Sequence, residues 1–280
     1  MKSLKYTLNN SFLFDLSPYE LNYQIPRALI ALAQLMNLTF TQEAYLFGAT
    51  GPATGLFSLP FAQITATLVL LWVISGYLPQ LSAPLHAYLS FSFFSSSIIL
   101  EGSDQVAQII TLLLIPICLF DRRMNLWGLK KYFRYKIPEM ANLFARSCLR
   151  VIQLQMAFIY LFAGAVKIGV PQWKDGSALY YWFNHTMGAA PFVKDALGWA
   201  LNSHFLSPVL NWGVLLLEFL LFGALFMVQS QKEKLLVPAL LFHFLIGIVF
   251  GLWAFGLIMS AGLLLYLTPA FLYQKKKSAV

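Results

Sequence analysis

The sequence has too few charged residues to cover the surface of a water-soluble protein. Only 11% of its 280 residues are Asp, Glu, Lys or Arg, and 59% are hydrophobic, whereas a soluble domain carries roughly 25% charge. Apolar runs of about 16–22 residues recur, enough or nearly enough to cross a membrane as helices. The ten-residue stretches of alternating polarity that a membrane barrel needs are missing. The sequence therefore predicts an all-α, polytopic integral membrane helix bundle, one domain over residues 1–280, in the plasma membrane.

Cysteines and familiar catalytic motifs are also scarce. Cys118 and Cys148, the two cysteines, flank the same basic loop, which argues against a structural disulfide or a cysteine metal site. There is no glycine-rich phosphate loop, no hydrolase serine elbow and no HExxH pair, so we expect no metal site. A cleavable signal peptide is missing as well. Residues 1–24 are too polar for one and are expected to form an interfacial amphipathic segment.

The net charge of +8 indicates membrane orientation rather than nucleic-acid binding. The basic residues gather in short loops between apolar runs, and positive loops face the cytoplasm. In a topology of eight spans, all but three of the nineteen basic residues fall on one side, Arg27 among them. The exceptions are Lys167, Lys174 and Lys194. We therefore expect both termini to be cytoplasmic and no nucleic-acid partner.

Eight membrane-spanning helices are expected, with bounds good to a few residues. They cover residues 25–42, 60–78, 85–100, 105–120, 148–169, 208–229, 236–251 and 255–270. The last two come from one apolar run that would be about 52 Å long as a single helix, so it must reverse near the glycines of residues 251–256. The outer connection, residues 170–207, is rich in aromatics. It either folds back over the outer mouth of the bundle or is a plain loop with aromatic anchors.

Lys167 is the most unusual residue of the apolar runs, because a charge in hydrocarbon costs a few kcal/mol or more. One interpretation is that its side chain extends to water at the outer interface. The other is that it faces the bundle interior, within reach of an acidic or aromatic residue from the outer segments. A lysine held away from water can lose its proton and act as a general base. Gly164, with Ala163 and Ala165, would let a neighbouring helix or a flat ligand approach closely.

Two more ionisable residues fall at middle depth in their predicted helices. Glu218 must be protonated or paired there, and His243 from the next helix is expected to meet it as a structural or proton-passing pair. By helix rise, Lys167 lies about 10 Å or more further outward, so no direct contact with Glu218 is expected. The candidate catalytic residues are Lys167, Glu218 and His243.

Other polar residues of the predicted helices are expected to be structural. Gln153 and Gln155 in the fifth helix would hold helices together by hydrogen bonds. His86, at the inner end of the third, is expected at the membrane interface.

The outer segments carry the candidates for substrate binding. Some of their acidic residues and histidines, including Glu101 and His204, could pair with Lys167 or bind an external substrate; the alternative is a solvated loop residue. The candidate substrate-binding residues are Trp173, Asp175, Tyr180, His185 and Asp104.

The stretch YLFAGAVKIGVPQWKDGSALYY resembles the signature of the horizontally transferred transmembrane domain, which vitamin K-dependent gamma-carboxylases share. The matching positions are Tyr160, Ala163-Gly164, Lys167, Trp173 and Asp175-Gly176. LLLEFLLF and the apolar C-terminal run are similar to the second half of that domain. PRALIALAQLMNLTF and LLLIPICLFDRR resemble the B-type membrane component of the sporulation-delaying-protein toxin system.

The resemblance implies a function at the outer membrane face. In the carboxylases the matching lysine deprotonates vitamin K hydroquinone, so Lys167 would be the base and vitamin K or menaquinol the cofactor. The toxin-system resemblance implies the maturation of a small secreted peptide precursor, together with a partner maturation protein. Two alternatives stay open: a quinol-dependent oxygenase or carboxylase that acts alone, and a non-enzymatic scaffold or immunity protein.

Overall fold

The computed structural model describes residues 23–40, 59–96, 102–121, 123–127, 138–186 and 189–267. Helices make up nearly all of this part of the chain, and it contains no strand, only an isolated bridge between Tyr77 and Asn125. The interfacial segment predicted for residues 1–24 lies almost wholly outside the described residues. So do Glu101, most of the basic loop and the basic C-terminal tail. The all-helical prediction is confirmed for the described residues.

Eight long helices occupy the predicted positions. They are α3 (Gln24–Phe40), α5 (Leu59–Ser75), α6 (Pro79–Ser96), α7 (Gly102–Phe120), α8 (Glu139–Gly169), α12 (Leu206–Gly223), α13 (Gln229–Phe250) and α14 (Trp253–Leu267). Three of them begin clearly earlier than expected, among them α13, which begins at Gln229 rather than at residue 236. α6 begins before Pro84, a residue that the prediction had placed just outside the helix. α8 continues backwards into the polar segment 139–147, which makes it about 46 Å long by helix rise.

Four of these helices are long and apolar enough to cross a membrane, judged by length and composition among the described residues. They are Gly102–Phe120, Glu139–Gly169, Leu206–Phe226 and Gln229–Phe250. Two shorter apolar helices are Phe61–Ser75 and Trp253–Leu267. The protein is therefore a helical membrane protein. The number of eight spans and the cytoplasmic position of both termini remain predictions.

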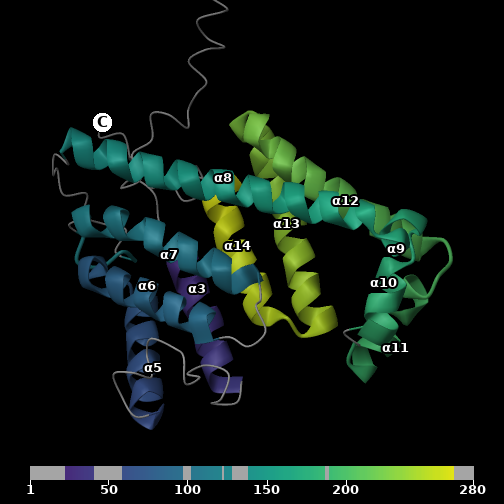
Figure 1. The fold of residues 1–280 in the computed structure, drawn as a ribbon, viewed down its shortest axis with the longest axis horizontal. Coiled ribbons are helices and arrows are strands. Elements are labelled where there is room, and N and C mark those ends of the chain that lie inside the picture. The colour runs from purple at the N-terminus through teal and green to yellow at the C-terminus, as the bar shows by residue number, and fades with distance from the viewer. Residues whose placement is uncertain are drawn as a thin grey trace, which may run out of the picture.

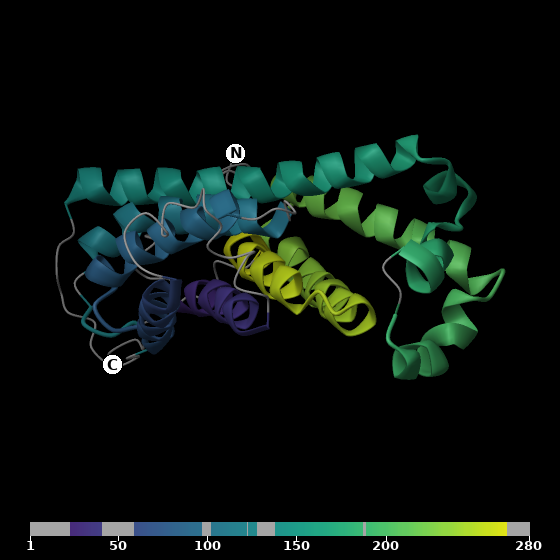
Figure 2. The ribbon, with the colours of Figure 1, turned by 60° about the horizontal axis from the view of Figure 1, so that its bottom comes forward.

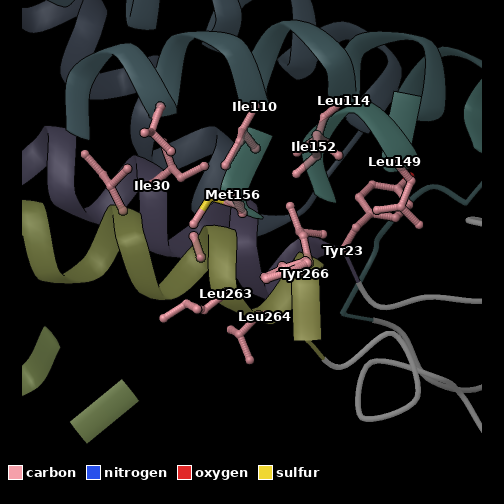
Figure 3. Packing of buried hydrophobic residues seen from close by; sticks show 14 of the residues in the cluster. Tyr23, Ile30, Ile110, Leu114, Leu149, Ile152, Met156, Leu263, Leu264 and Tyr266 are labelled. Carbon is pink, nitrogen blue, oxygen red and sulfur yellow. The ribbon is translucent and has the colours of Figure 1, made fainter. Parts of the chain in front are cut away.

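The helices run in two crossing sets around α14. Figure 1 shows α6, α7 and α8 running across the view while α3, α5, α13 and α14 run steeply. α14 contacts α3, α7, α8 and α13, and every residue from 261 to 267 is buried. Figure 3 shows Leu263, Leu264 and Tyr266 of α14 among side chains of α3, α7 and α8. The core of the molecule therefore forms around the end of the last described helix.

The outer connection is folded rather than a plain loop. It forms α9 (Pro171–Asp175), α10 (Ala178–Tyr181), the π-helical turn η2 (Trp182–Thr186) and α11 (Pro191–Leu201). These elements gather at one end of the molecule, beyond the end of α8 (Figures 1 and 2). Phe183 and Val193 pack with Val249 of α13, and α9, α10 and α11 contact α12. The connection therefore covers the ends of α12 and α13.

Two residues expected near the cytoplasmic side are buried between α3 and α6. The Arg27 guanidinium, in a residue 1% exposed, donates hydrogen bonds to Gln24 and Ser82. His86 is also 1% exposed, and its Nε2 lies 3.1 Å from Gln34 Oε1. The cytoplasmic side expected for Arg27 and the interface position expected for His86 remain predictions, but the sequence did not indicate that both side chains are buried between helices. Polar side chains of α3 and α6 bond to one another, and such contacts cannot be predicted by counting basic residues along the chain.

The predicted reversal between the last two helices is confirmed at Gly251. This residue ends α13 in the left-handed conformation, at φ 74°, and its N–H donates to Gly247 O at 2.9 Å. The two helices then pack closely, since a Cβ on Gly256 would lie 2.8 Å from the carbonyl oxygen of His243. Gln153 also ties helices together as expected, because its Nε2 donates to Leu265 O at 3.3 Å.

Gly256→Ala should loosen the contact between α13 and α14. The added methyl group meets backbone rather than a flexible side chain, and overpacking of this kind costs about 1–3 kcal/mol. The thermal unfolding midpoint of the purified protein in detergent should therefore fall. Gly213→Ala in α12 is the matched control, because a Cβ there meets nothing within 4 Å and alanine favours the helix. An unchanged midpoint for Gly256→Ala would contradict the packing.

Candidate functional site

A partly buried ion pair joins α8 to α12. Lys167 Nζ donates to Glu218 Oε1, and the side chains of Lys167 and Glu218 are 21% and 4% exposed. The ammonium also lies 5.3 Å from the centroid of the Trp173 ring. Lys167 thus lies next to an acidic and an aromatic residue, which agrees with the interpretation that it faces the bundle interior. The acidic partner, however, comes from a helix and not from an outer segment. A charge pair in so apolar a setting is a candidate functional centre.

The expectation that Lys167 and Glu218 do not touch is wrong, and the register of α12 explains why. Asn211 Nδ2 donates to Trp173 O at 3.0 Å, and a Cβ on Gly176 would lie 2.7 Å from Pro208. The first two turns of α12 therefore lie beside α9, beyond the end of α8. Glu218, two turns after Asn211, is brought level with Lys167. The expectation from the sequence assumed that the end of α8 and the start of α12 lie at the same depth in the membrane.

Tyr160 and His243 form a second polar pair, which lies further from the groove along α8 than the first. Tyr160 lies seven residues before Lys167, so both side chains lie on one face of α8. Its hydroxyl is 2.9 Å from Nε2 of His243, and the two residues are each 2% exposed. His243 was expected to meet Glu218. The structure records no hydrogen bond or ion pair between these two described residues, because Tyr160 takes the place opposite the ring.

The helix α8 contributes one member to each polar pair, Tyr160 and Lys167, on the same face. Between the helices, Gly164 lets Phe219 approach closely, since a Cβ there would lie 3.0 Å from Cζ of that ring. The prediction that this glycine permits a close approach is confirmed. We call Lys167, Glu218, Tyr160 and His243 the polar centre.

A groove of about 370 Å³ opens beside the polar centre. Its lining residues come from the end of α8, α9, α10 and η2, and are Val170, Gln172, Trp173, Ala178, Tyr181 and Trp182. Trp173 therefore has two neighbours: the ammonium of Lys167 and the groove. The Trp173 ring also meets Trp182 edge-on, with centroids 6.3 Å apart. The volume lies at the small end of the range for ligand pockets, which are mostly apolar and carry few polar groups.

The other predicted substrate-binding residues are spread over the outer connection and beyond. Asp175 is exposed, and hydrogen bonds from the Ser177 hydroxyl and backbone N–H lower its pKa. Tyr180 is also exposed, and its ring centroid lies 6.2 Å from that of His185. Asp104 lies in the first turn of α7. Lys167 pairs with Glu218 rather than with Asp104 or Asp175.

Asn211 was not singled out from the sequence, although it fixes the carbonyl of Trp173 and is fully buried. The sequence did contain a sign of this role. Asn211 is a lone amide in the apolar segment LSPVLNWGVLLLEF, and it lies on the same helix face as Glu218, seven residues later. Tyr160 was noted only as part of a motif.

Among the described residues, no group of three or more His, Cys, Asp or Glu could hold a metal ion. Cys118 and Cys148 are free and buried.

Glu218→Gln should destabilise the protein, because it leaves the Lys167 ammonium without its anion. Breaking a buried pair from one side costs on the order of 3 kcal/mol, so the unfolding midpoint in detergent should fall clearly. The double variant Lys167→Met/Glu218→Leu removes both charges and should recover much of the loss. Glu233→Gln is the control, since Glu233 is exposed on α13 and accepts a hydrogen bond from the exposed Gln229. Additive losses in the double variant would contradict the pairing.

Two relatives from Bacillus subtilis (strain 168) are similar to almost the whole chain. The uncharacterized protein YitO is 29% identical over 278 residues, which cover 90% of this chain and 87% of YitO. Sporulation-delaying protein SdpB is 27% identical over 270 residues, which cover 90% of this chain and 83% of SdpB. No family model and no solved structure matches the chain. The chain that holds this polar centre is therefore similar, nearly end to end, to a protein named for the delay of sporulation.

Proposed function

We propose that this protein matures a secreted peptide toxin at the outer face of the plasma membrane, as a multi-pass protein with Lys167 as the base. The observation that carries the proposal is the Lys167–Glu218 pair beside Trp173, which also lines the groove. The similarity to sporulation-delaying protein SdpB supports a place in a peptide-toxin system. The small secreted precursor would be the substrate, and a second maturation protein would assist at the outer face.

The geometry suits removal of a proton from a bound substrate. In the ion pair, Glu218 can take a proton from the ammonium, which leaves a neutral amine next to a neutral acid. Such an amine is a usable base, and the Trp173 ring lies beside its nitrogen. A snorkelling lysine would extend to water. Here the ammonium instead binds a carboxylate whose side chain is 4% exposed, which favours the functional interpretation of Lys167.

The outer connection would hold the substrate. Trp173, Tyr181 and Trp182 line the groove, while Tyr180 of α10 and His185 of η2 add an exposed aromatic surface nearby. Aromatic side chains of this kind provide large contact areas at little cost in conformational entropy. Asp175 would act indirectly by holding the turn at Ser177. Asp104 has no role in this proposal, because it lies on α7.

The resemblance to the horizontally transferred transmembrane domain adds a cofactor to the proposal. A flat ring fits the character of the groove, since three aromatic residues and Val170 line it. If vitamin K hydroquinone or menaquinol is the cofactor, Trp173, Tyr181 and Trp182 would hold it. It would supply oxygen-dependent chemistry next to Lys167. This would place the protein with carboxylase-like enzymes.

Lys167→Met should abolish maturation of the peptide. Cells that carry the candidate precursor and partner would express wild type, Lys167→Met or the control Lys194→Met, with a lysine on α11 replaced. Mass spectrometry of the secreted peptide should show the mature form with wild type and the control, and only unmodified precursor with Lys167→Met. Immunoblots of the membranes would confirm equal amounts of protein. Mature peptide from Lys167→Met at the wild-type level would refute the role of the base.

The cofactor has a separate test. Purified protein in nanodiscs would receive reduced vitamin K or menaquinone under air, alone and with the precursor and partner. Quinone epoxide in the wild-type sample, but not with Lys167→Met, would establish the quinol-dependent chemistry. No epoxide in the complete mixture would exclude it and leave the peptide-maturation proposal to the cellular test.

A further inference from the structure

The last turn of α14 is held by side chains of both α8 and α13. Gln153 Nε2 of α8 donates to Leu265 O at 3.3 Å, and Gln229 Nε2 of α13 donates to Leu267 O at 2.9 Å. Gln153 lies in the half of α8 that is far from the groove, and Gln229 is the first residue of α13. Three helices therefore meet at the end of α14 that lies away from the groove.

Two cations lie at this meeting point. Arg150 Nη1 donates to Gln153 Oε1 at 3.0 Å. Lys232, in the first turn of α13, is 3% exposed, and its ammonium lies 5.9 Å from the centroid of the Tyr266 ring. Because Gln153 binds Leu265 and Tyr266 is the next residue, both cations approach the same turn of α14. We call Arg150 and Lys232 the basic pair.

The end of α14 does not account for the basic pair. Cations often lie at the C-terminal end of a helix, where they bind the last carbonyl groups. Here Leu265 O and Leu267 O accept from glutamine amides instead. In the part of the chain that the structure describes, no carboxylate pairs with Lys232. Buried charges are normally paired, so this ammonium is a place where an anion from outside the chain would be stabilised.

The basic pair lies at the depth of the lipid headgroups of the leaflet opposite the groove. Arg150 and Lys167 belong to the same helix, and helix rise separates them by about 25 Å. This distance is close to the roughly 30 Å thickness of the hydrocarbon layer. Lys232 lies in the first turn of a candidate span that ends at Phe250. A lipid phosphate of that leaflet would therefore be level with both cations.

An aromatic strip on the surface connects α8 with the turn before α13. Phe158 of α8 and Phe226 of the 3-10 helix η3 (Ala224–Phe226) are 46% and 78% exposed. The Phe222 ring lies between them in contact distance, with centroids 6.5 Å from Phe158 and 6.1 Å from Phe226. Phe158 lies about two helical turns after Arg150, towards the membrane centre. The aromatic strip, Phe158, Phe222 and Phe226, is thus an apolar surface at the depth of acyl chains.

We propose that the basic pair and the aromatic strip bind one anionic phospholipid. Arg150 and Lys232 would bind its phosphate by charge-assisted hydrogen bonds, and the aromatic strip would contact its acyl chains. A basic site between membrane helices favours an anionic headgroup over a zwitterionic one, whose own cation offsets the phosphate. This site is separate from the polar centre, and its occupation does not depend on the proposed function.

Lipid binding to the purified full-length protein in detergent tests this proposal. Native mass spectrometry would measure the apparent Kd for phosphatidylglycerol and for phosphatidylcholine with the same acyl chains. Wild type should bind phosphatidylglycerol more tightly. Arg150→Gln and Lys232→Gln should each weaken the binding of phosphatidylglycerol about fivefold, which corresponds to about 1 kcal/mol per basic residue. Neither should change the Kd for phosphatidylcholine.

Lys234→Gln is the matched control. Lys234 is exposed on α13, two residues after Lys232, and therefore on another face of the helix, so its loss should leave both Kd values unchanged. Lys232→Arg keeps the charge and should keep the preference for phosphatidylglycerol.

Equal Kd values for the two lipids in wild type would overturn the proposal. So would a loss in Lys234→Gln as large as that in Arg150→Gln, or a loss of the preference in Lys232→Arg. Complete displacement of phosphatidylglycerol by millimolar inorganic phosphate would contradict the role of the aromatic strip.

Discussion

The ion pair between Lys167 and Glu218 is the interaction on which the functional end of the molecule depends. Two opposite charges in an apolar setting are tolerable only together, so α8 and α12 must keep the register that brings them into contact. That register requires the first turns of α12 to run beside α9. The pair therefore fixes the outer connection as well as the helices, and with it the position of Trp173.

Trp173 lies between this ion pair and the groove. Its carbonyl is held by Asn211 of α12, its ring lies near the Lys167 ammonium, and it also lines the groove. A ligand in the groove would thus contact a residue whose ring lies beside the Lys167 ammonium. Phe219 of α12 packs closely against Gly164 of α8, one turn before Lys167. Together these contacts hold the ion pair, Trp173 and the groove in one arrangement.

Patterns along the chain predicted the helices because apolar length and glycine position are local properties. The reversal near residues 251–256 followed from the length of a single apolar run, and Lys167 stood out because its charge lies in one. The contact between Lys167 and Glu218 could not be predicted, because it depends on how residues 170–207 fold and how far α12 extends beyond α8. The burial of Arg27 and His86 was missed for a similar reason. Their partners, Ser82 and Gln34, lie on other helices more than fifty residues away.

The most direct test of the account exchanges the two charges. In Lys167→Glu/Glu218→Lys, the ion pair can form again with reversed polarity, while the amine no longer projects from α8 beside Trp173. Thermal unfolding in detergent and mass spectrometry of the secreted peptide would be measured on the same variants. The account predicts that the exchanged protein unfolds near the wild-type midpoint, that each single substitution lowers it, and that no mature peptide forms. An exchanged protein as unstable as the single variants, or one that matures the peptide normally, would contradict it.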